Sequence, residues 1–270
     1  MKKLTLLIIC STIIFTSNKI MAMGQTQTKP KTILIHATEI GDTKTIQALC
    51  NDFNMDVSKL DRKKYTEQLI KDDLNIKKSI LSASERLNFG ILGENLEQEY
   101  RNKYKLSEYI TREAIDDDNN TVSAAVIATL KNDYTSLDII LSGLKKLKSQ
   151  KALSEFLDKT QVNTNYTLLI MALLSYDDER VEDNIKTINI LLQYGANPKE
   201  SVLTIDDKKV DVIQMATKTQ NIEALKYFKA MYLKLSQSQS FIVPKLLEQR
   251  AGDKAEISSY VYQARELANT

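Results

Sequence analysis

Five alanines recur along this chain at an almost constant spacing, and this regularity constrains its fold more than any other feature. They are Ala37, Ala83, Ala128, Ala172 and Ala216, separated by 46, 45, 44 and 44 residues. A fixed period of roughly 20 to 50 residues indicates one supersecondary unit repeated along the chain. A small residue at the same place in each unit lets the helices of neighbouring units approach closely. We therefore predict an all-α helical-repeat solenoid of about five helix pairs with a period of about 44 residues.

The composition favours helices over strands. The 270 residues include only seven Gly and three Pro, whereas a β-sandwich or barrel needs many turns. A single histidine nearly excludes enzymes that work through His. The net charge of +2 gives no electrostatic reason to expect a nucleic acid partner.

The first 22 residues resemble a secretion signal. Lys2 and Lys3 precede an apolar run over residues 4–15, which is too short to span the ~30 Å hydrocarbon core of a membrane as a helix. A small-residue cleavage site then ends at Ala22. We predict a bacterial Sec signal peptide over residues 1–22, and therefore an exported protein, periplasmic or secreted, with no transmembrane segment after cleavage. An uncleaved membrane anchor is the alternative.

Cleavage at this point would leave a single cysteine. Cys10 is removed with the signal, so Cys50 has no partner for an intramolecular disulfide. Ala48 and Leu49 precede Cys50, so we expect a buried core thiol, with a reactive thiol as the alternative. We predict a flexible linker over residues 23–31, the repeat array over 32–235 and a C-terminal helical cap over 236–270.

The most informative segment is residues 188–198, which read Ile-Asn-Ile-Leu-Leu-Gln-Tyr-Gly-Ala-Asn-Pro. Leu191 and Leu192 belong to an apolar helix face, and Gly195 stands where a helix ends in the left-handed conformation. The following Asn-Pro stops the helix. This segment resembles the end of an ankyrin repeat, whose pattern is a Leu-Leu pair followed by Gly-Ala-Asp/Asn.

The beginning of the same unit also resembles that family. Thr167 and Leu169 match the Thr and Leu of its Thr-Pro-Leu-His turn, and Ala172 matches the alanine of its first helix. The resemblance covers about residues 32–232, although the Thr-Pro-Leu-His turn is degenerate throughout. The usual repeat has ~33 residues, so each unit here carries about 11 more. A HEAT- or tetratricopeptide-like superhelix is the structural alternative, but the Gly-Ala-Asn-Pro ending favours ankyrin.

The additional residues can be assigned to particular units. We expect residues 176–183 to lengthen the connection between the two helices of the fourth unit. Residues 143–159 add a basic amphipathic stretch to the third unit, and residues 96–111 extend a helix of the second.

The sequence offers no catalytic, cofactor or metal motif. Residues 116–120 begin like an EF-hand loop, but the required Gly is replaced by Thr121 and the required Glu by Ile127. We therefore expect a solvated loop there. His36, the one histidine, is expected to have a structural role. We predict no catalytic residue, no metal and no cofactor.

These observations predict a non-enzymatic, monomeric protein–protein interaction module whose partner is another protein. Ankyrin-family proteins generally bind through the turns that join successive repeats and the adjoining inner helix. The resemblance therefore implies a partner-binding set with Tyr166 as its anchor: Asn163, Asn165, Tyr166, Asp206, Asp207 and Lys208. Alternatively, Tyr166 packs only across its own turn. The competing functions are an enzyme that uses carboxylates or Tyr in a repeat-lined groove, and a structural envelope protein.

Overall fold

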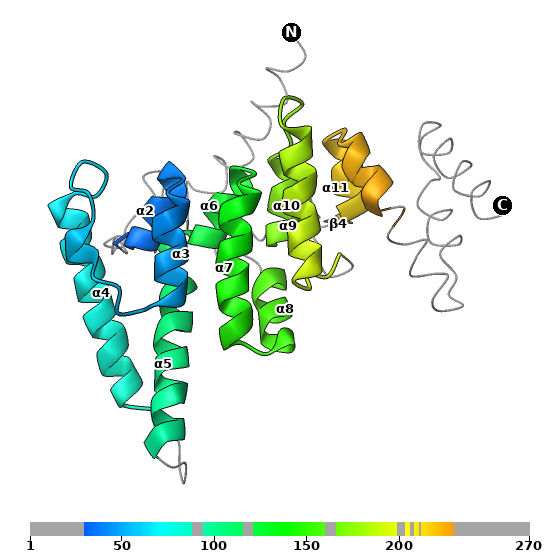
Figure 1. Ribbon diagram of the computed structural model, residues 1–270. Coiled ribbons are helices and arrows are strands. Elements are labelled where there is room, and N and C mark those ends of the chain that lie inside the picture. The colour runs from blue at the N-terminus through cyan, green and yellow to red at the C-terminus, as the bar shows by residue number, and fades with distance from the viewer. Residues whose placement is uncertain are drawn as a thin grey trace, which may run out of the picture.

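The structure, a computed structural model, describes most of the chain between residues 30 and 230. The described residues are 30–87, 94–115, 121–159, 166–198, 203–205, 208–210, 212–228 and 230. They are mostly helical and include two short antiparallel hairpins (Figure 1). The coarse prediction of an all-α chain is confirmed, although the hairpins were not expected. The predicted signal peptide and C-terminal cap lie outside the described residues, as does the linker up to residue 29.

The elements follow one another in the order in which they are labelled in Figure 1. The helices are α2 (Ile33–Ile40), α3 (Thr43–Asn51), the 3₁₀ turn η1 (Val57–Lys59), α4 (Glu67–Glu85), α5 (Glu94–Ile110), α6 (Ala124–Leu130), α7 (Tyr134–Leu147), α8 (Gln150–Asp158), α9 (Leu168–Leu174), α10 (Val181–Gln193) and α11 (Val212–Lys218). A further helical segment covers residues 222–228. The strands are β1 (Ala114–Ile115) with β2 (Thr121–Val122), and β3 (Leu203–Ile205) with β4 (Lys208–Val210).

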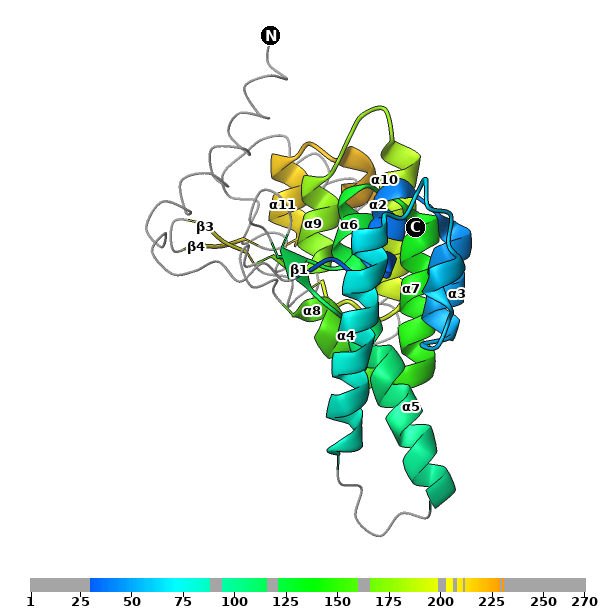
Figure 2. The ribbon, with the colours of Figure 1, turned by 90° about the vertical axis from the view of Figure 1, so that its left-hand side faces the viewer.

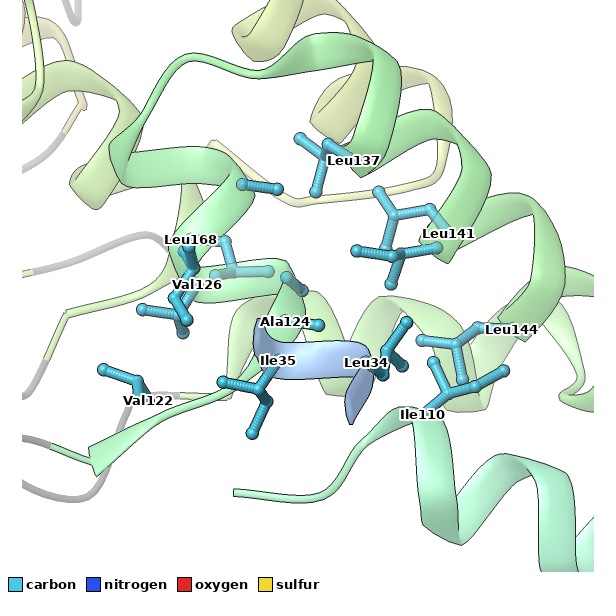
Figure 3. Packing of buried hydrophobic residues seen from close by; sticks show 14 of the residues in the cluster. Leu34, Ile35, Ile110, Val122, Ala124, Val126, Leu137, Leu141, Leu144 and Leu168 are labelled. Carbon is cyan, nitrogen blue, oxygen red and sulfur yellow. The ribbon is translucent and has the colours of Figure 1, made fainter. Parts of the chain in front are cut away.

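The helices form two rows. In the inner row, α2 contacts α6, α6 contacts α9, and α9 contacts α11. In the outer row, α3 contacts α7 and α7 contacts α10, and these helices lie side by side in Figure 1. Within each pair, α2 packs on α3, α6 on α7 and α9 on α10. The core between the rows contains Leu34 of α2, Val126 of α6, and Leu137 and Leu141 of α7 (Figure 3).

Local sequence explains where the inner helices begin. The N-cap hydroxyl accepts a hydrogen bond from the backbone N–H three residues later, which satisfies a donor that the first helical turn leaves free. The oxygen–nitrogen distances are 3.2 Å at Thr32, 3.3 Å at Ser123 and 3.3 Å at Thr167. Each of these residues lies five positions before one of the periodic alanines, namely Ala37, Ala128 and Ala172.

The turn from an inner to an outer helix is also built from a repeated local pattern. A residue in the left-handed region ends the inner helix at Gly41, Asn132 and Gln220, where φ is 70°, 52° and 57°. The next backbone N–H then bonds back to the periodic alanine, at 2.8 Å from Asp42 to Ala37, 2.9 Å from Asp133 to Ala128 and 2.9 Å from Asn221 to Ala216. These bonds satisfy carbonyls at the helix end.

The same turn residue also starts the second helix. The side-chain oxygens of Asp42, Asp133 and Asn221 each accept the backbone N–H three residues later, at 3.2, 3.0 and 2.9 Å. One residue therefore ends one helix and caps the next, which keeps the two helices of a pair close together.

Ala83 does not share the position of the other four alanines. Ala37, Ala128, Ala172 and Ala216 are completely buried in the inner row, whereas Ala83 is half-buried in the 19-residue helix α4. Because α2 contacts α6 directly, α4 and α5 do not form a layer between them. The second of the five expected helix pairs is therefore absent from this row. The interval of 91 residues between Ala37 and Ala128 contains an insertion instead.

The insertion is a pair of long helices. The expectation that residues 96–111 extend the preceding helix is wrong, because α4 ends at Glu85 and α5 begins at Glu94. The two helices pack against each other, and their free ends project beyond the rows (Figure 1). α5 also contacts α3 and α7, while α4 contacts α2 and η1.

Two other expectations are confirmed. Residues 175–180 separate α9 from α10, so the predicted longer connection is present over residues 176–180, whereas residues 181–183 of the predicted segment belong to α10. Gly195 follows α10 with φ of 104°, a backbone conformation that glycine adopts without the penalty of a Cβ atom.

Candidate partner-binding site

Two hairpins that lead into the inner row lie on one side of the molecule. The β1–β2 hairpin ends immediately before the cap of α6, and the β3–β4 hairpin precedes α11. Figure 2 shows both hairpins on the same side of the two rows, with α3 and α7 toward the opposite side. We call this the hairpin side. Strand β4, which contains Lys208 of the predicted partner-binding set, lies on this side.

The structure places only part of the predicted set. Tyr166 is half-buried, packs against the edge of the core and directly precedes Thr167, the cap of α9. Lys208 begins β4 and pairs with Ile205, but its side chain is outside what is described. Four members of the set lie outside the described residues: Asn163, Asn165, Asp206 and Asp207.

The position of Tyr166 can be compared with that of Val122. Each is the residue immediately before an inner-row cap, and Val122 is only 6% exposed. The larger tyrosine keeps part of its surface accessible at the same point. This geometry suits an aromatic anchor, and it also suits packing across the turn.

Two shallow depressions lie on the described surface. One, of about 580 Å³, lies between α8 and the residues that follow α10; the other, of about 500 Å³, lies between α3 and α7. Both are open to solvent. Within the described residues, no group of three or more His, Cys, Asp or Glu side chains could hold a metal ion.

A buried polar cluster joins the insertion to the first inner helix. Asp73 Oδ1 accepts the Ile33 N–H at 2.8 Å and the Tyr109 hydroxyl at 2.7 Å. Lys77 Nζ lies 3.7 Å from Asp73 Oδ2 and donates to the Met55 carbonyl oxygen at 3.2 Å. The Asp73 side chain is fully buried, and the cluster holds α4 against the start of α2.

Burial dominates the ionisation of this cluster. It raises the pKa of Asp73, and the bonds from Ile33 and Tyr109 and the charge of Lys77 oppose that rise. It lowers the pKa of Lys77, which the charge of Asp73 opposes. It also raises the pKa of Tyr109 well above its ordinary value, and Asp73 adds to that rise. The sequence does not predict this cluster, because an Asp and a Lys four positions apart on a helix resemble an ordinary surface ion pair.

A second buried network joins three successive helix pairs through asparagines. Asn184 of α10 donates from Nδ2 to Asn132 Oδ1 at 2.9 Å and to the Ala172 carbonyl at 2.7 Å. Its Oδ1 accepts from Asn221 Nδ2 at 2.8 Å. All three asparagine side chains are buried. We call this network the asparagine ladder. It fixes the inner-to-outer turns relative to one another.

His36 and Cys50 both have structural surroundings, as expected. His36 Nε2 lies 2.9 Å from the Lys64 carbonyl oxygen, and Nδ1 lies 3.3 Å from Glu39 Oε2. Cys50 is buried, and its Cβ atom lies 3.2 Å from where a Cβ on Gly143 would be, so α3 and α7 approach closely there. Burial raises the pKa of the Cys50 thiol to about 12.

Comparison of the chain with protein-family models, with curated proteins and with solved structures finds no match. The proposals below therefore depend on the residues and contacts of this chain and on the resemblance of its sequence to ankyrin repeats. In the part that the structure describes, no helix is both long and apolar enough to cross a membrane.

Proposed function

We propose that this chain is an exported, divergent ankyrin-like repeat protein that binds another protein through its hairpin side. In this proposal the solenoid contains four helix pairs, formed by α2 with α3, α6 with α7, α9 with α10, and α11 with residues 222–228. The helices α4 and α5 are an insertion after the first pair. The protein has no enzymatic activity of its own.

The repeated turn is the observation that carries the proposal. Three turns share a left-handed residue, a hydrogen bond of 2.8–2.9 Å back to the periodic alanine and a side-chain cap for the next helix. In a solenoid each repeat contacts only its neighbours, which agrees with the successive contacts of the inner and outer rows. The hairpins before α6 and α11 supply the projecting connections that ankyrin-like proteins use for binding.

The shape of the surface supports a protein partner over a small substrate. Small-molecule sites are concave and enclose most of the ligand, whereas the two depressions described above are open. A row of packed helices is already ordered before binding, so association costs less conformational entropy. The described helices behind the hairpin side therefore offer an extended support for a protein partner.

Export is supported by the sequence. The Lys2-Lys3 pair, the apolar run over residues 4–15 and the small residue at position 22 form a Sec signal pattern. The proposed location is the periplasm or the extracellular medium.

Replacing Tyr166 tests the proposed binding side. Tyr166→Ala should weaken partner capture by roughly 1–2 kcal/mol, which is about a 5- to 30-fold loss of affinity. The mature chain is used as bait, the captured protein is identified, and the affinity of both baits for it is measured. Thermal unfolding of both forms is followed by circular dichroism.

Tyr134→Ala is the matched control, because Tyr134 is also half-buried but begins α7 in the outer row. It should leave the affinity unchanged. If Tyr166→Ala lowers the melting temperature without a specific loss of binding, Tyr166 packs its own turn. Equal losses of affinity for the two variants would mean that the partner does not bind specifically through the hairpin side.

A further inference from the structure

The insertion carries a stripe of exposed side chains on α4 that the stacking of the rows does not use. Leu74 is 41% exposed and Leu81 is 42% exposed. Lys71 and Lys78, both exposed, lie three positions before each leucine. Residues three, four and seven apart share one face of a helix, so these four side chains form a continuous stripe about 15 Å long. We call this the α4 stripe.

Its apolar content is unusual for this molecule. Seven large apolar side chains of the described residues are prominently exposed, and four of them belong to α4 and α5. The inner row is complete without this insertion, since α2 contacts α6 directly. Two long helices that are not needed for stacking, yet expose leucines at helical spacing, provide a surface for another helix.

The lysines of the stripe lack the ion pairs that some lysines on other helices make. Neither Lys71 nor Lys78 makes an ion pair within the described part of the chain. By contrast, Lys103 of α5 bridges Glu99 at 2.6 Å, and Lys186 of α10 bridges Glu182 at 2.7 Å. Two unpaired ammonium groups beside two leucines are complementary to carboxylates beside an apolar ridge.

We propose that the α4 stripe docks an acidic amphipathic helix of a partner protein. The leucines at i and i+7 receive the apolar ridge of that helix, and Lys71 and Lys78 pair with Asp or Glu side chains along its edge. This surface is separate from the hairpin side and does not depend on Tyr166.

The composition of the stripe argues against two other occupants. Glu67 and Glu85 continue the same spacing on either side of it, and both are exposed. These carboxylates would repel acidic groups on any partner beyond the segment that faces Lys71 and Lys78. Two half-exposed leucines offer little apolar area for insertion into a membrane. A second copy of α4 in parallel register would place lysine against lysine.

Photocrosslinking in the cells that produce the protein tests the occupant. The crosslinker p-benzoyl-phenylalanine replaces Leu81 in the full chain, and the joined segment is identified by mass spectrometry. The same replacement at Leu130, which is 47% exposed on α6, is the control. We expect Leu81 alone to join a partner segment with apolar residues at helical spacing and flanking Asp or Glu. The proposal is overturned if Leu81 crosslinks to lipid, to a second copy of the chain or to this chain's own C-terminal residues, or if no crosslink forms.

The affinity of the chain for a synthetic peptide with the sequence of the crosslinked segment then shows how much the lysine charges contribute to binding. The Lys71→Glu/Lys78→Glu variant should bind it at least tenfold more weakly than the unchanged chain, and its affinity should fall less as salt is raised. Leu74→Ser/Leu81→Ser should also weaken binding at least tenfold, whereas Leu130→Ser and Tyr166→Ala should not. All four side chains of the stripe are exposed, so circular dichroism should show unchanged folding. Equal affinity of the charge-reversed and unchanged chains overturns the proposal.

Discussion

The asparagine ladder predicts a large stability effect from one substitution. Asn184→Leu keeps the branched shape of the side chain but removes three hydrogen bonds from a fully buried site. The consequence depends on what each former partner retains.

The three partners are affected unequally. Asn221 Nδ2 has no other acceptor among its described hydrogen bonds, so a buried donor is left unsatisfied, at about 1–3 kcal/mol. The Ser175 hydroxyl lies 3.3 Å from the Asn132 oxygen and 3.0 Å from the Ala172 carbonyl oxygen, and its single proton can bond only one of them at a time. One of these two acceptors can therefore keep a donor, and we expect their combined loss to be about 1–2 kcal/mol. We expect Asn184→Leu to lower the free energy of unfolding by about 2–5 kcal/mol.

Asn189→Leu is the matched control on the same helix. Asn189 is half-buried and accepts one described hydrogen bond, from the Tyr227 hydroxyl at 2.6 Å. Because that partly exposed hydroxyl can turn to water, we expect a loss of only about 0.5–1 kcal/mol. Asn184→Ala should cost as much as Asn184→Leu, which separates lost hydrogen bonds from overpacking by the larger side chain.

Urea unfolding, followed by circular dichroism, measures all three variants against the unchanged chain. The reasoning is refuted if Asn184→Leu and Asn189→Leu differ by less than about 1 kcal/mol. Such a result would mean that water or a shift of the turns satisfies the ladder without Asn184.

Three further outcomes can be checked on the same protein. Ala172→Leu should overpack the inner row and lower the free energy of unfolding in urea by about 1–3 kcal/mol. Ala83→Leu, on the half-buried face of α4, should lower it by less than about 1 kcal/mol. Equal losses would contradict the different positions of the two alanines. With a thiol pKa of about 12, Cys50 should have a thiolate fraction of about 10⁻⁴ at pH 8, so it should resist iodoacetamide until the chain is unfolded in urea. Mass spectrometry of the exported protein should show an N-terminus near Met23, and finding only the full-length chain in the cytosol would reject the signal peptide.

The local features of the fold could be predicted from sequence because they depend on residues only a few positions apart. Gly195 shows this directly: its sequence context predicts a left-handed helix end, and its φ is 104°. Burial of Cys50 follows equally from its apolar neighbours. The alanines at 37, 128, 172 and 216 are buried, as their period suggested, because close helix contact requires a small side chain.

The candidate site could be predicted only in part. The resemblance selected the connections before the inner helices, and the structure places Tyr166 beside the cap of α9. The buried networks left no sequence signal. Asn132, Asn184 and Asn221 stand 4, 12 and 5 residues after their respective alanines, so no alignment of the units brings them together.

The sequence by itself determined the helix end at Gly195 and the burial of four periodic alanines, since each depends on backbone conformation or side-chain size within one short segment. Only the tertiary structure decided that Ala83 belongs to an insertion, because a small residue at a regular interval does not reveal which helices its own helix contacts. It likewise decided that Asp73 meets Ile33 and Tyr109, residues 40 and 36 positions away. Such contacts depend on how the long helices α4 and α5 pack against the rows, and that packing is set by the whole core at once.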